Sequence, residues 1–392
     1  MSNISPISLV SGAAVGAALV FFALRWIPSK APPPKTSNGF AALVGDTKVV
    51  YLKELSELLG IKIYGKCEFL NPGGSVKDRV ALKLAQEAKQ AGCHTVVEAT
   101  SGSTGISLAM ACKQLGLKLK IVMPDDVSSE KKRSIQVLGG DLHLVRPVSY
   151  SDPNHMCRIA QKFAASESGC YYANQFENLV NFESHFHGTA VEILKDVPDI
   201  DVFVAAAGTG ATMSGCAARL KEEKDHIVTI LADPQGSALS ARVNSGVLYH
   251  AFDREGRRQK IYSDTITEGV GLNRLTENFK RGIAYMDHGV SVSDQESVHM
   301  AFYLLYTEGL FLGSSSAVNV AAVVKAVKRG IIKPGQTVVT ILCDSGSRHV
   351  SKFWSIAFLE EKGLLPGYVN KVTGIIDDIT RMTSPLEFVR AD

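Results

Sequence analysis

The 392-residue sequence lacks the features that mark several classes of protein. Its formal net charge is only +3, and its basic residues form no cluster interleaved with aromatic side chains, so nucleic acid is not an expected partner. It contains seven cysteines, an odd number, with no C-x-x-C pair and no spacing typical of metal ligands. These absences predict a protein of a reducing compartment with no metal site.

Signals for nucleotide binding are also missing or incomplete. No G-x-x-x-x-G-K-[ST] phosphate loop occurs anywhere in the chain. A dinucleotide fingerprint begins at Gly208 and Gly210, and Asp233 at the end of the next apolar run resembles the acid that binds ribose. The third glycine of the fingerprint, however, is replaced by Met213. A nucleotide site is therefore the weaker interpretation of this segment.

The N-terminus lacks charge altogether up to residue 24. Its uncharged apolar run, extended to residue 27, is just long enough as a helix to cross a hydrocarbon core of about 30 Å. The basic n-region of a secretory signal and the basic amphipathic face of a matrix presequence are both absent. We therefore expect a transmembrane anchor over 1–28, a proline-rich linker over 29–42 and, from the basic residues 25, 30 and 35, a cytosolic remainder.

From residue 43 onward, short β-rich runs alternate with helical patterns. Each run is followed within a few residues by a helix-like segment, which predicts an α/β fold with mostly parallel sheets. The expected strands lie within residues 62–69, 94–99, 120–124, 141–145, 201–207, 228–233 and 337–343.

Three of these strands lead directly into turns rich in glycine and serine, at residues 98–105, 205–215 and 341–348. In a parallel sheet such turns meet at the carboxyl ends of the strands, where ligands bind. Residues 208–212, GTGAT, are the best phosphate cradle, because small residues expose backbone amides and two hydroxyls supplement them. For any one turn, a simple strand-to-helix connection is the alternative.

The stretch NPGGSVKDR, residues 71–79, combines a turn with the start of a helix. Ser75 and Asp78 have the spacing of a capping box, and Lys77 lies in the first helical turn, where a cation opposes the helix dipole. A solvated surface lysine is the ordinary explanation. Pyridoxal phosphate, however, needs one lysine, one phosphate cradle and a partner for its pyridine nitrogen, and this chain offers all three.

Residues 43–353 resemble the cysteine synthase and cystathionine β-synthase family, whose members are fold type II pyridoxal-phosphate enzymes. The matching motifs occur in family order: GDTKVVYLKEL, NPGGSVKDR, EATSGSTGISLA, NQFENLVNFESHFHGTAVEI, AAAGTGATMSG, ADPQGSAL, EGVGLNR, EGLFLGSSSA and ILCDSGSRHVSKF. The resemblance implies a catalytic domain over 43–392 with two α/β subdomains of twisted sheets, the smaller and mobile one spanning roughly 84–187. It also implies a homodimer.

The anchor together with this catalytic region is similar to the cysteine synthase-like proteins of the fungal mitochondrial outer membrane. This resemblance implies a single-pass protein of that membrane, bound to lipid through its N-terminal helix. The residues themselves do not distinguish the mitochondrial outer membrane from the endoplasmic reticulum.

The resemblance implies a role for each matching position. Lys77 would carry the cofactor as an aldimine, and Ser103 would bind the cofactor at its 3-hydroxyl, which the family's asparagine amide contacts. The remaining implied positions are Thr100, Ser101, Gly102, Thr104 and Gln175 for the substrate carboxylate, Gly208, Thr209, Gly210, Ala211 and Thr212 for the phosphate, and Ser345 for the pyridine nitrogen. A hydroxyl does not keep that nitrogen protonated, which favours loss of a β leaving group over transamination.

The implied reaction makes cysteine from O-acetylserine or serine and sulfide, through an aminoacrylate. The chain departs from the family pattern at Ser103, where TSGNTG has asparagine, at Ala211, where GTGGT has glycine, and at Cys343, where proline precedes DSG. The change at Ser103 bears on activity. A serine or threonine dehydratase, a cystathionine β-synthase-like enzyme and a non-catalytic membrane-tethered homologue therefore remain alternatives.

Overall fold

The computed structural model describes residues 39–249, 265–369 and 385–389. Its contacts divide the chain into two units, residues 1–42 and 43–392. Of the first unit only residues 39–42 are described, so the anchor predicted over 1–28 and most of the linker lie outside the described residues. Within the described ranges, no helix combines the length and the apolar character needed to cross a bilayer.

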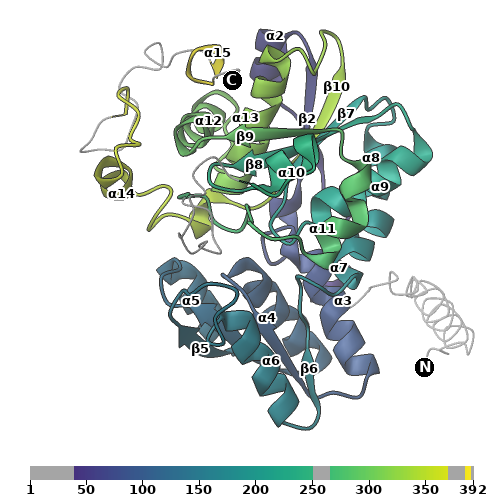
Figure 1. The fold of residues 1–392 in the computed structure, drawn as a ribbon, viewed down its shortest axis with the longest axis vertical. Helices are drawn as coiled ribbons and strands as arrows, with labels where there is room; N and C mark the ends of the chain where they lie inside the picture. Colours follow the sequence, from purple (N-terminus) through teal and green to yellow (C-terminus); the bar gives the residue numbers. More distant parts are fainter. Residues whose placement is uncertain (1–38, 250–264, 370–384, 390–392) are drawn as a thin grey trace, which may run out of the picture. The chain divides into compact units, whose positions relative to one another are not determined.

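The larger unit is built on two sheets (Figure 1). The first sheet has six strands, and its strands are parallel except for the antiparallel edge pair β1–β2. In spatial order they are β1 (Val49–Tyr51), β2 (Lys62–Cys67), β10 (Thr337–Leu342), β7 (Val202–Ala206), β8 (Val228–Pro234) and β9 (His288–Val292).

The second sheet has four strands, all parallel. In spatial order they are β5 (Asp141–Val145), β4 (Lys118–Pro124), β3 (Thr95–Ala99) and β6 (Cys170–Tyr172). The expectation of an α/β fold with mostly parallel sheets is confirmed. All seven strands predicted from the sequence form, whereas β1, β6 and β9 were missed, the first two because three residues carry almost no periodicity.

Helices cover both sheets. Around the six-stranded sheet lie α2 (Lys53–Leu59), α7 (Val180–Ser184), α8 (Ala190–Asp196), α9 (Ala211–Glu223), α10 (Leu239–Ser245), α11 (Glu277–Gly282), α12 (Asp294–Thr307), α13 (Ser314–Lys328), α14 (Ile356–Glu361) and α15 (Pro385–Phe388). With the four-stranded sheet lie α3 (Lys77–Gln90), α4 (Ser103–Leu115), α5 (Ser129–Val137) and α6 (Met156–Ser166). A π-helical turn, His185–Thr189, joins α7 to α8.

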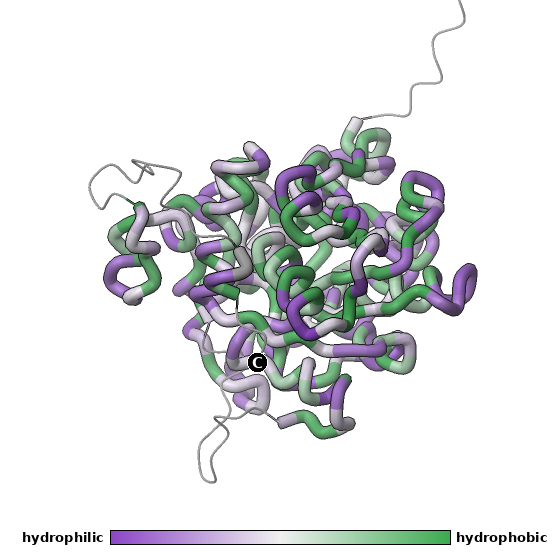
Figure 2. Tube along the Cα trace, turned by 90° about the horizontal axis from the view of Figure 1, so that it is seen from above, coloured by the Kyte–Doolittle hydropathy of each residue, from purple (hydrophilic) through white to green (hydrophobic). Residues whose placement is uncertain are grey.

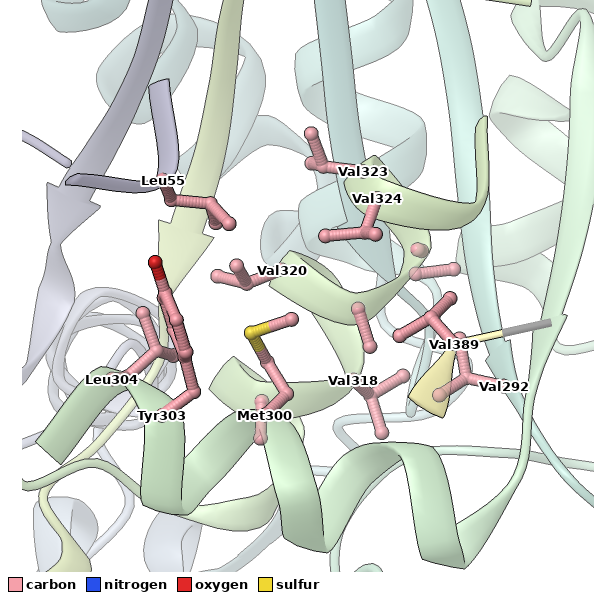
Figure 3. Packing of buried hydrophobic residues seen from close by; sticks show 14 of the residues in the cluster. Leu55, Val292, Met300, Tyr303, Leu304, Val318, Val320, Val323, Val324 and Val389 are labelled. Carbon is pink, nitrogen blue, oxygen red and sulfur yellow. The ribbon is translucent and has the colours of Figure 1, made fainter. Parts of the chain in front are cut away.

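The main hydrophobic core lies between the six-stranded sheet and the pair α12–α13. Figure 3 shows Met300 of α12 pointing toward Val318 and Val320 of α13. Helix α13 is buried almost all round. Along the tube in Figure 2, hydrophobic and hydrophilic stretches alternate, as expected where elements bury one face and expose the other. Burying this apolar surface is the main source of stability for the scaffold that carries the loops.

The predicted capping box at the start of α3 is wrong. The helix begins at Lys77, and neither Ser75 nor Asp78 makes the reciprocal pair of bonds. The Asp78 carboxylate instead accepts a 2.5 Å hydrogen bond from the backbone N–H of Gly73 and another from the Ser107 hydroxyl of α4. Tertiary structure therefore redirects Asp78, and it ties the turn that precedes Lys77 to the neighbouring helix.

Candidate active site

A cavity of about 240 Å³ lies at the carboxyl ends of strands from both sheets. The turns that follow β3, β7 and β10 all contribute to its lining, as the sequence predicted for three glycine- and serine-rich turns. The four-stranded sheet adds the segment after β4, and the six-stranded sheet adds residues 265–272. The cavity is thus formed jointly by the two sheets.

Lys77 lines this cavity at the first turn of α3. The start of the helix is bound to the end of β10, because the N–H of Val76 donates to the Cys343 carbonyl at 3.0 Å and Ser75 forms an antiparallel bridge with Asp344. Burial lowers the pKa of the Lys77 amine, and Cys343 and Asp344 oppose this shift only in part. A larger fraction of Lys77 is therefore uncharged at a given pH than of a solvated lysine, as a nucleophile or base requires.

The cradle predicted at 208–212 begins α9 and borders the cavity. Glycine is required at two of its positions. A Cβ on Gly208 would lie 2.1 Å from the Gly269 carbonyl oxygen, and a Cβ on Gly210, whose φ is +88°, would lie 2.6 Å from Phe279 Cβ. Glycine at these two positions therefore lets the chain turn closely into the helix, whose N-terminus favours an anion.

The two hydroxyls of the cradle are held by neighbours. Thr209 Oγ1 accepts a 3.1 Å hydrogen bond from Asn181 Nδ2 and keeps its own proton to donate. Thr212 Oγ1 lies 3.2 Å from His185 Nε2, and burial keeps the pKa of this histidine well below its ordinary range. A neutral histidine beside Thr212 orients the hydroxyl.

The predicted substrate loop reaches the same cavity from the other sheet. Thr100, Ser101, Ser103 and Thr104 line it, as does Gln175, whose Oε1 accepts a 2.7 Å hydrogen bond from Thr104 Oγ1. Gly102 does not line the cavity. Its φ is +141°, and a Cβ there would lie 2.4 Å from Lys131 Cδ, so glycine lets the stem of Lys131 pack against the loop.

These groups fit pyridoxal phosphate. An amine with a lowered pKa faces the same cavity as a helix N-terminus whose positions 208 and 210 admit only glycine, and serine and threonine hydroxyls line the cavity around both. Lys77 would hold the aldehyde carbon, and residues 208–212 would hold the phosphate.

Comparisons with known proteins agree with this site. The signature of the family described as "Pyridoxal-phosphate dependent enzyme" matches residues 41–344. The chain belongs to this pyridoxal-phosphate-dependent family. Cysteine synthase 2 of Schizosaccharomyces pombe is 41% identical over 379 residues, which cover 91% of this chain and 95% of the relative. A Saccharomyces cerevisiae protein, named provisionally as a mitochondrial cysteine synthase, is 42% identical over 83% of this chain and 86% of the relative.

A solved structure is similar as well. An O-acetylserine-dependent cystathionine β-synthase from Helicobacter pylori superposes with a TM-score of 0.70 at 29% identity, covering 81% of this chain and 98% of that protein. As a member of the family, the chain uses pyridoxal 5'-phosphate as its cofactor.

The structure does not place Ser345, the expected partner of the pyridine nitrogen, in the cavity. The Ser345 hydroxyl instead caps the short 3-10 turn Gly346–Arg348 by accepting from the N–H of Ser347 at 3.3 Å. Ser315, at the start of α13, does line the cavity beside Lys77 and Cys343. The sequence held a signal for it in EGLFLGSSSA, which resembles a family motif but was given no role.

The departure from the family at Ala211 is accommodated without strain. Ala211 is the first residue of α9 and has an ordinary helical conformation, since Asp46 and Asn174 are the described non-glycine residues with positive φ. It is buried and does not line the cavity. Ser103 and Cys343, the other two departures, both line the cavity.

The nucleotide interpretation finds no support at this site. Asp233, the residue that resembled a ribose-binding acid, does not line the cavity. It is fully buried at the end of β8, where its carboxylate accepts a 2.7 Å hydrogen bond from the N–H of Ser240 in α10. This hydrogen bond joins the end of β8 to α10, away from the cavity.

Polar contacts beside the cavity join α5 and the segment after β4, of the four-stranded sheet, to residues 268, 351 and 352. Lys131 of α5 pairs with Glu268, and the Glu130 carboxylate accepts hydrogen bonds from the Ser351 N–H at 2.7 Å and from the Ser351 hydroxyl at 2.6 Å. Lys352 Nζ donates to the Asp126 carbonyl at 2.6 Å. Sequence reasoning assigned no role to these residues, because their partners lie more than a hundred positions away.

Proposed function

We propose that this protein makes cysteine by replacing the β-substituent of O-acetylserine, or of serine, with sulfide. The observation that carries the proposal is the shared cavity of Lys77, the 208–212 cradle and the hydroxyl loop with Gln175. Cysteine synthases among the relatives, at 41% to 43% identity over most of the chain, support the same reaction.

In this mechanism the cofactor supplies one effect: when bound, pyridoxal phosphate withdraws electrons from the substrate, so that Cα–H becomes acidic and a group can leave Cβ. The N–H groups and hydroxyls of 208–212 hold the phosphate. Thr100, Ser101, Thr104 and Gln175 hold the substrate carboxylate. The uncharged Lys77 amine would take the proton from Cα. The β-substituent would leave Cβ as acetate, or as water once it has taken up a proton, and hydrosulfide would form the new bond at Cβ. The protonated Lys77 would then return a proton to Cα, which completes cysteine.

Ser315 is our proposed partner for the pyridine nitrogen, in place of Ser345. It lies at the start of α13, lines the cavity and is 8% exposed, so its hydroxyl works in a mostly desolvated setting. A hydroxyl shares a hydrogen bond with the nitrogen without transferring a full proton, and the ring stays a moderate electron sink. That property favours β-replacement over transamination.

The test uses the purified full-length protein with its cofactor. Incubation with O-acetylserine and sulfide should release acetate and form cysteine in equal amounts. Formation of pyruvate and ammonia from serine or threonine without sulfide would indicate a dehydratase, and formation of cystathionine from serine and homocysteine would indicate a cystathionine β-synthase. A protein that binds no cofactor and forms none of these products would be a non-catalytic homologue.

We further propose that residues 84–187 form the smaller, mobile subdomain of a catalytic domain over 43–392. The four-stranded sheet lies within these bounds, and polar contacts such as Lys131–Glu268 and Glu130–Ser351 join it to the rest. The Glu130–Ser351 contacts are exposed and can exchange with water, whereas the Lys131–Glu268 pair is mostly buried. Loss of these contacts would let the substrate loop move away from Lys77 and admit a substrate.

Finally, we infer a single-pass protein of the mitochondrial outer membrane, anchored by residues 1–28 with its catalytic domain in the cytosol, and a homodimer. The uncharged N-terminal run and the basic residues that follow it support the anchor and its orientation. The provisional mitochondrial name of the yeast relative supports the organelle. Light scattering of the purified protein tests the dimer.

A further inference from the structure

Glu98 is a buried carboxyl group that the proposed mechanism leaves unused. It is the fourth residue of β3, directly before the substrate loop, and its side chain is 0% exposed. Its Oε2 accepts a 3.3 Å hydrogen bond from the backbone N–H of Gln175, whereas Oε1 has no hydrogen-bond partner among the described residues. A carboxyl group buried with only half of its bonding capacity used is costly and calls for an explanation.

The turn that Glu98 contacts is itself unusual. Asn174 has a φ of +49°, a left-handed conformation that costs free energy in any residue other than glycine. This turn aims the Gln175 side chain, whose Nε2 donates to the Ala99 carbonyl at 3.1 Å and whose Oε1 accepts from Thr104 at 2.7 Å. The position of the Gln175 amide therefore depends on a backbone that must be held in place from outside.

We propose that Glu98 is a positioning residue for the substrate: its carboxyl holds the backbone of Gln175 and thereby sets the Gln175 amide against Thr104. This inference rests on the proposed function, since it assumes that Thr104 and Gln175 bind the substrate carboxylate. Glu98 acts through Gln175 and has no contact with the substrate itself, because it does not line the cavity.

The protonation state of Glu98 makes the role measurable. Burial raises its pKa from an ordinary value of 4.5 to about 8, and hydrogen bonds from Gln175 and from the backbone of Ala99 and Asn174 oppose the shift only in part. Among the described residues near this site, the cation is Arg274, and it is paired with Glu177 at 2.6 Å. Beside Glu98, β4 places Ile121, β6 carries the Tyr172 hydroxyl, and α6 carries the Cys157 thiol, whose pKa burial raises to about 12.

Helices α3 and α4, on the remaining side of Glu98, add no unpaired charge that would shift its pKa further. Helix α4 buries no charged residue. Helix α3 buries Asp78, which is bound to Gly73 and Ser107, and Arg79, which is paired with Glu68 and Glu192. Glu98 is therefore mostly neutral at pH 7. Above pH 8 it becomes a carboxylate in a dry site, and the free-energy cost of burying that charge disfavours the packed arrangement of Glu98 and the turn at 174–175 that it contacts.

The experiment compares wild type with Glu98→Gln, which keeps the shape and stays neutral at every pH, and with Glu98→Ala. KM and kcat for O-acetylserine are measured by acetate release on the full-length holoenzyme between pH 7 and pH 9. If only the neutral form supports binding, a pKa of about 8 makes wild-type KM rise about tenfold more than that of Glu98→Gln over this range. The substrate's own titration cancels, because all proteins share the same solutions.

A second readout needs no activity. Because the folded pKa is raised, the folded state binds more protons than the unfolded state between pH 4.5 and about 8. The melting temperature of wild type, relative to Glu98→Gln, should therefore decline as pH rises through this window and stay level above it. Glu167→Gln, at an exposed glutamate just before β6, serves as a matched control and should keep the wild-type pH dependence.

The outcomes separate the two proposals. A wild-type protein that releases no acetate from O-acetylserine refutes the proposed function, whatever the melting data show. The positioning role is overturned if the wild type is active, its KM equals that of Glu98→Gln at every pH, and Glu98→Ala leaves KM unchanged. A raised KM with unchanged kcat in Glu98→Ala, and rescue by glutamine at pH 7, supports it.

Discussion

The Arg79 guanidinium binds the Glu68 carboxylate through two 2.7 Å hydrogen bonds, and both side chains are almost completely buried. Arg79 lies two residues after Lys77 in α3, and Glu68 directly follows β2, so the pair joins the helix of the candidate lysine to the six-stranded sheet. Glu192 of α8 adds hydrogen bonds of 2.6 and 2.7 Å to the same guanidinium. The position of Lys77 thus depends on an ion cluster outside the cavity.

Replacing Arg79 with methionine should destabilise the protein strongly. The substitution leaves the fully buried Glu68 without its cation, a loss of about 3–5 kcal/mol in the free energy of unfolding. Urea unfolding followed by circular dichroism measures it. The matched control is Lys280→Met, because Lys280 pairs with Glu277 at 2.6 Å on the exposed surface, where such pairs contribute about 1 kcal/mol or less. Equal effects of the two substitutions would contradict a structural role for the buried cluster.

Lys77→Ala should abolish covalent attachment of the cofactor while the fold stays intact. Loss of the amine removes both the anchor and the base, so acetate release should fall by about a thousandfold or more. Borohydride reduction followed by peptide mass mapping detects the lysine adduct. Lys83→Ala, at an exposed lysine of the same helix, should retain it. A reducible adduct that persists in Lys77→Ala would show that another lysine holds the cofactor.

Ser315→Ala and Ser345→Ala distinguish the two candidate partners of the pyridine nitrogen. Only Ser315 lines the cavity, so its loss should shift the absorption spectrum of the bound cofactor and weaken cofactor binding by about fivefold, the equivalent of one hydrogen bond of about 1 kcal/mol. Ser345→Ala should leave the spectrum unchanged. The opposite pattern would restore the role that the sequence resemblance assigns to Ser345.

Ser103→Asn restores the residue of the family motif TSGNTG at the edge of the cavity. A longer amide can reach the cofactor's 3-hydroxyl, and one added hydrogen bond corresponds to about 1 kcal/mol, or roughly fivefold in an equilibrium. We expect faster release of acetate from O-acetylserine in a rapid-mixing experiment at equal cofactor occupancy. A slower variant would identify Ser103 as an adaptation to another substrate, and a dehydratase or a different β-replacement would then be preferred.

The orientation of the chain is tested on intact organelles. The uncharged N-terminus and the basic residues after it predict a catalytic domain exposed to the cytosol. Protease added outside intact mitochondria should therefore remove residues 43–392, while a matrix protein remains protected as the control. Protection of this fragment until the outer membrane is opened would reverse the predicted orientation.

Local chemistry along the chain was sufficient for much of this description. Strands such as 202–206 and 337–342 are buried apolar runs, and the turns after them are rich in glycine, so their periodicity and composition predicted both the parallel sheets and the phosphate cradle. Lys77 stood out because a cation opposes the dipole at a helix N-terminus. Such features arise within a few residues and can be recognised without knowing the fold.

Other features depended on partners distant in the sequence. Ser315 lines the cavity because α13 packs across the six-stranded sheet. Ser345 does not, because the chain leaves the cavity after Cys343 and Asp344 and enters a 3-10 turn. Asp78 binds the Ser107 hydroxyl instead of forming the expected capping box. Glu98 is neutral because the strands and helices packed around it exclude water and raise its pKa. Which hydroxyl faces a ligand and which acid keeps its proton are consequences of tertiary packing and desolvation, and no local pattern encodes them.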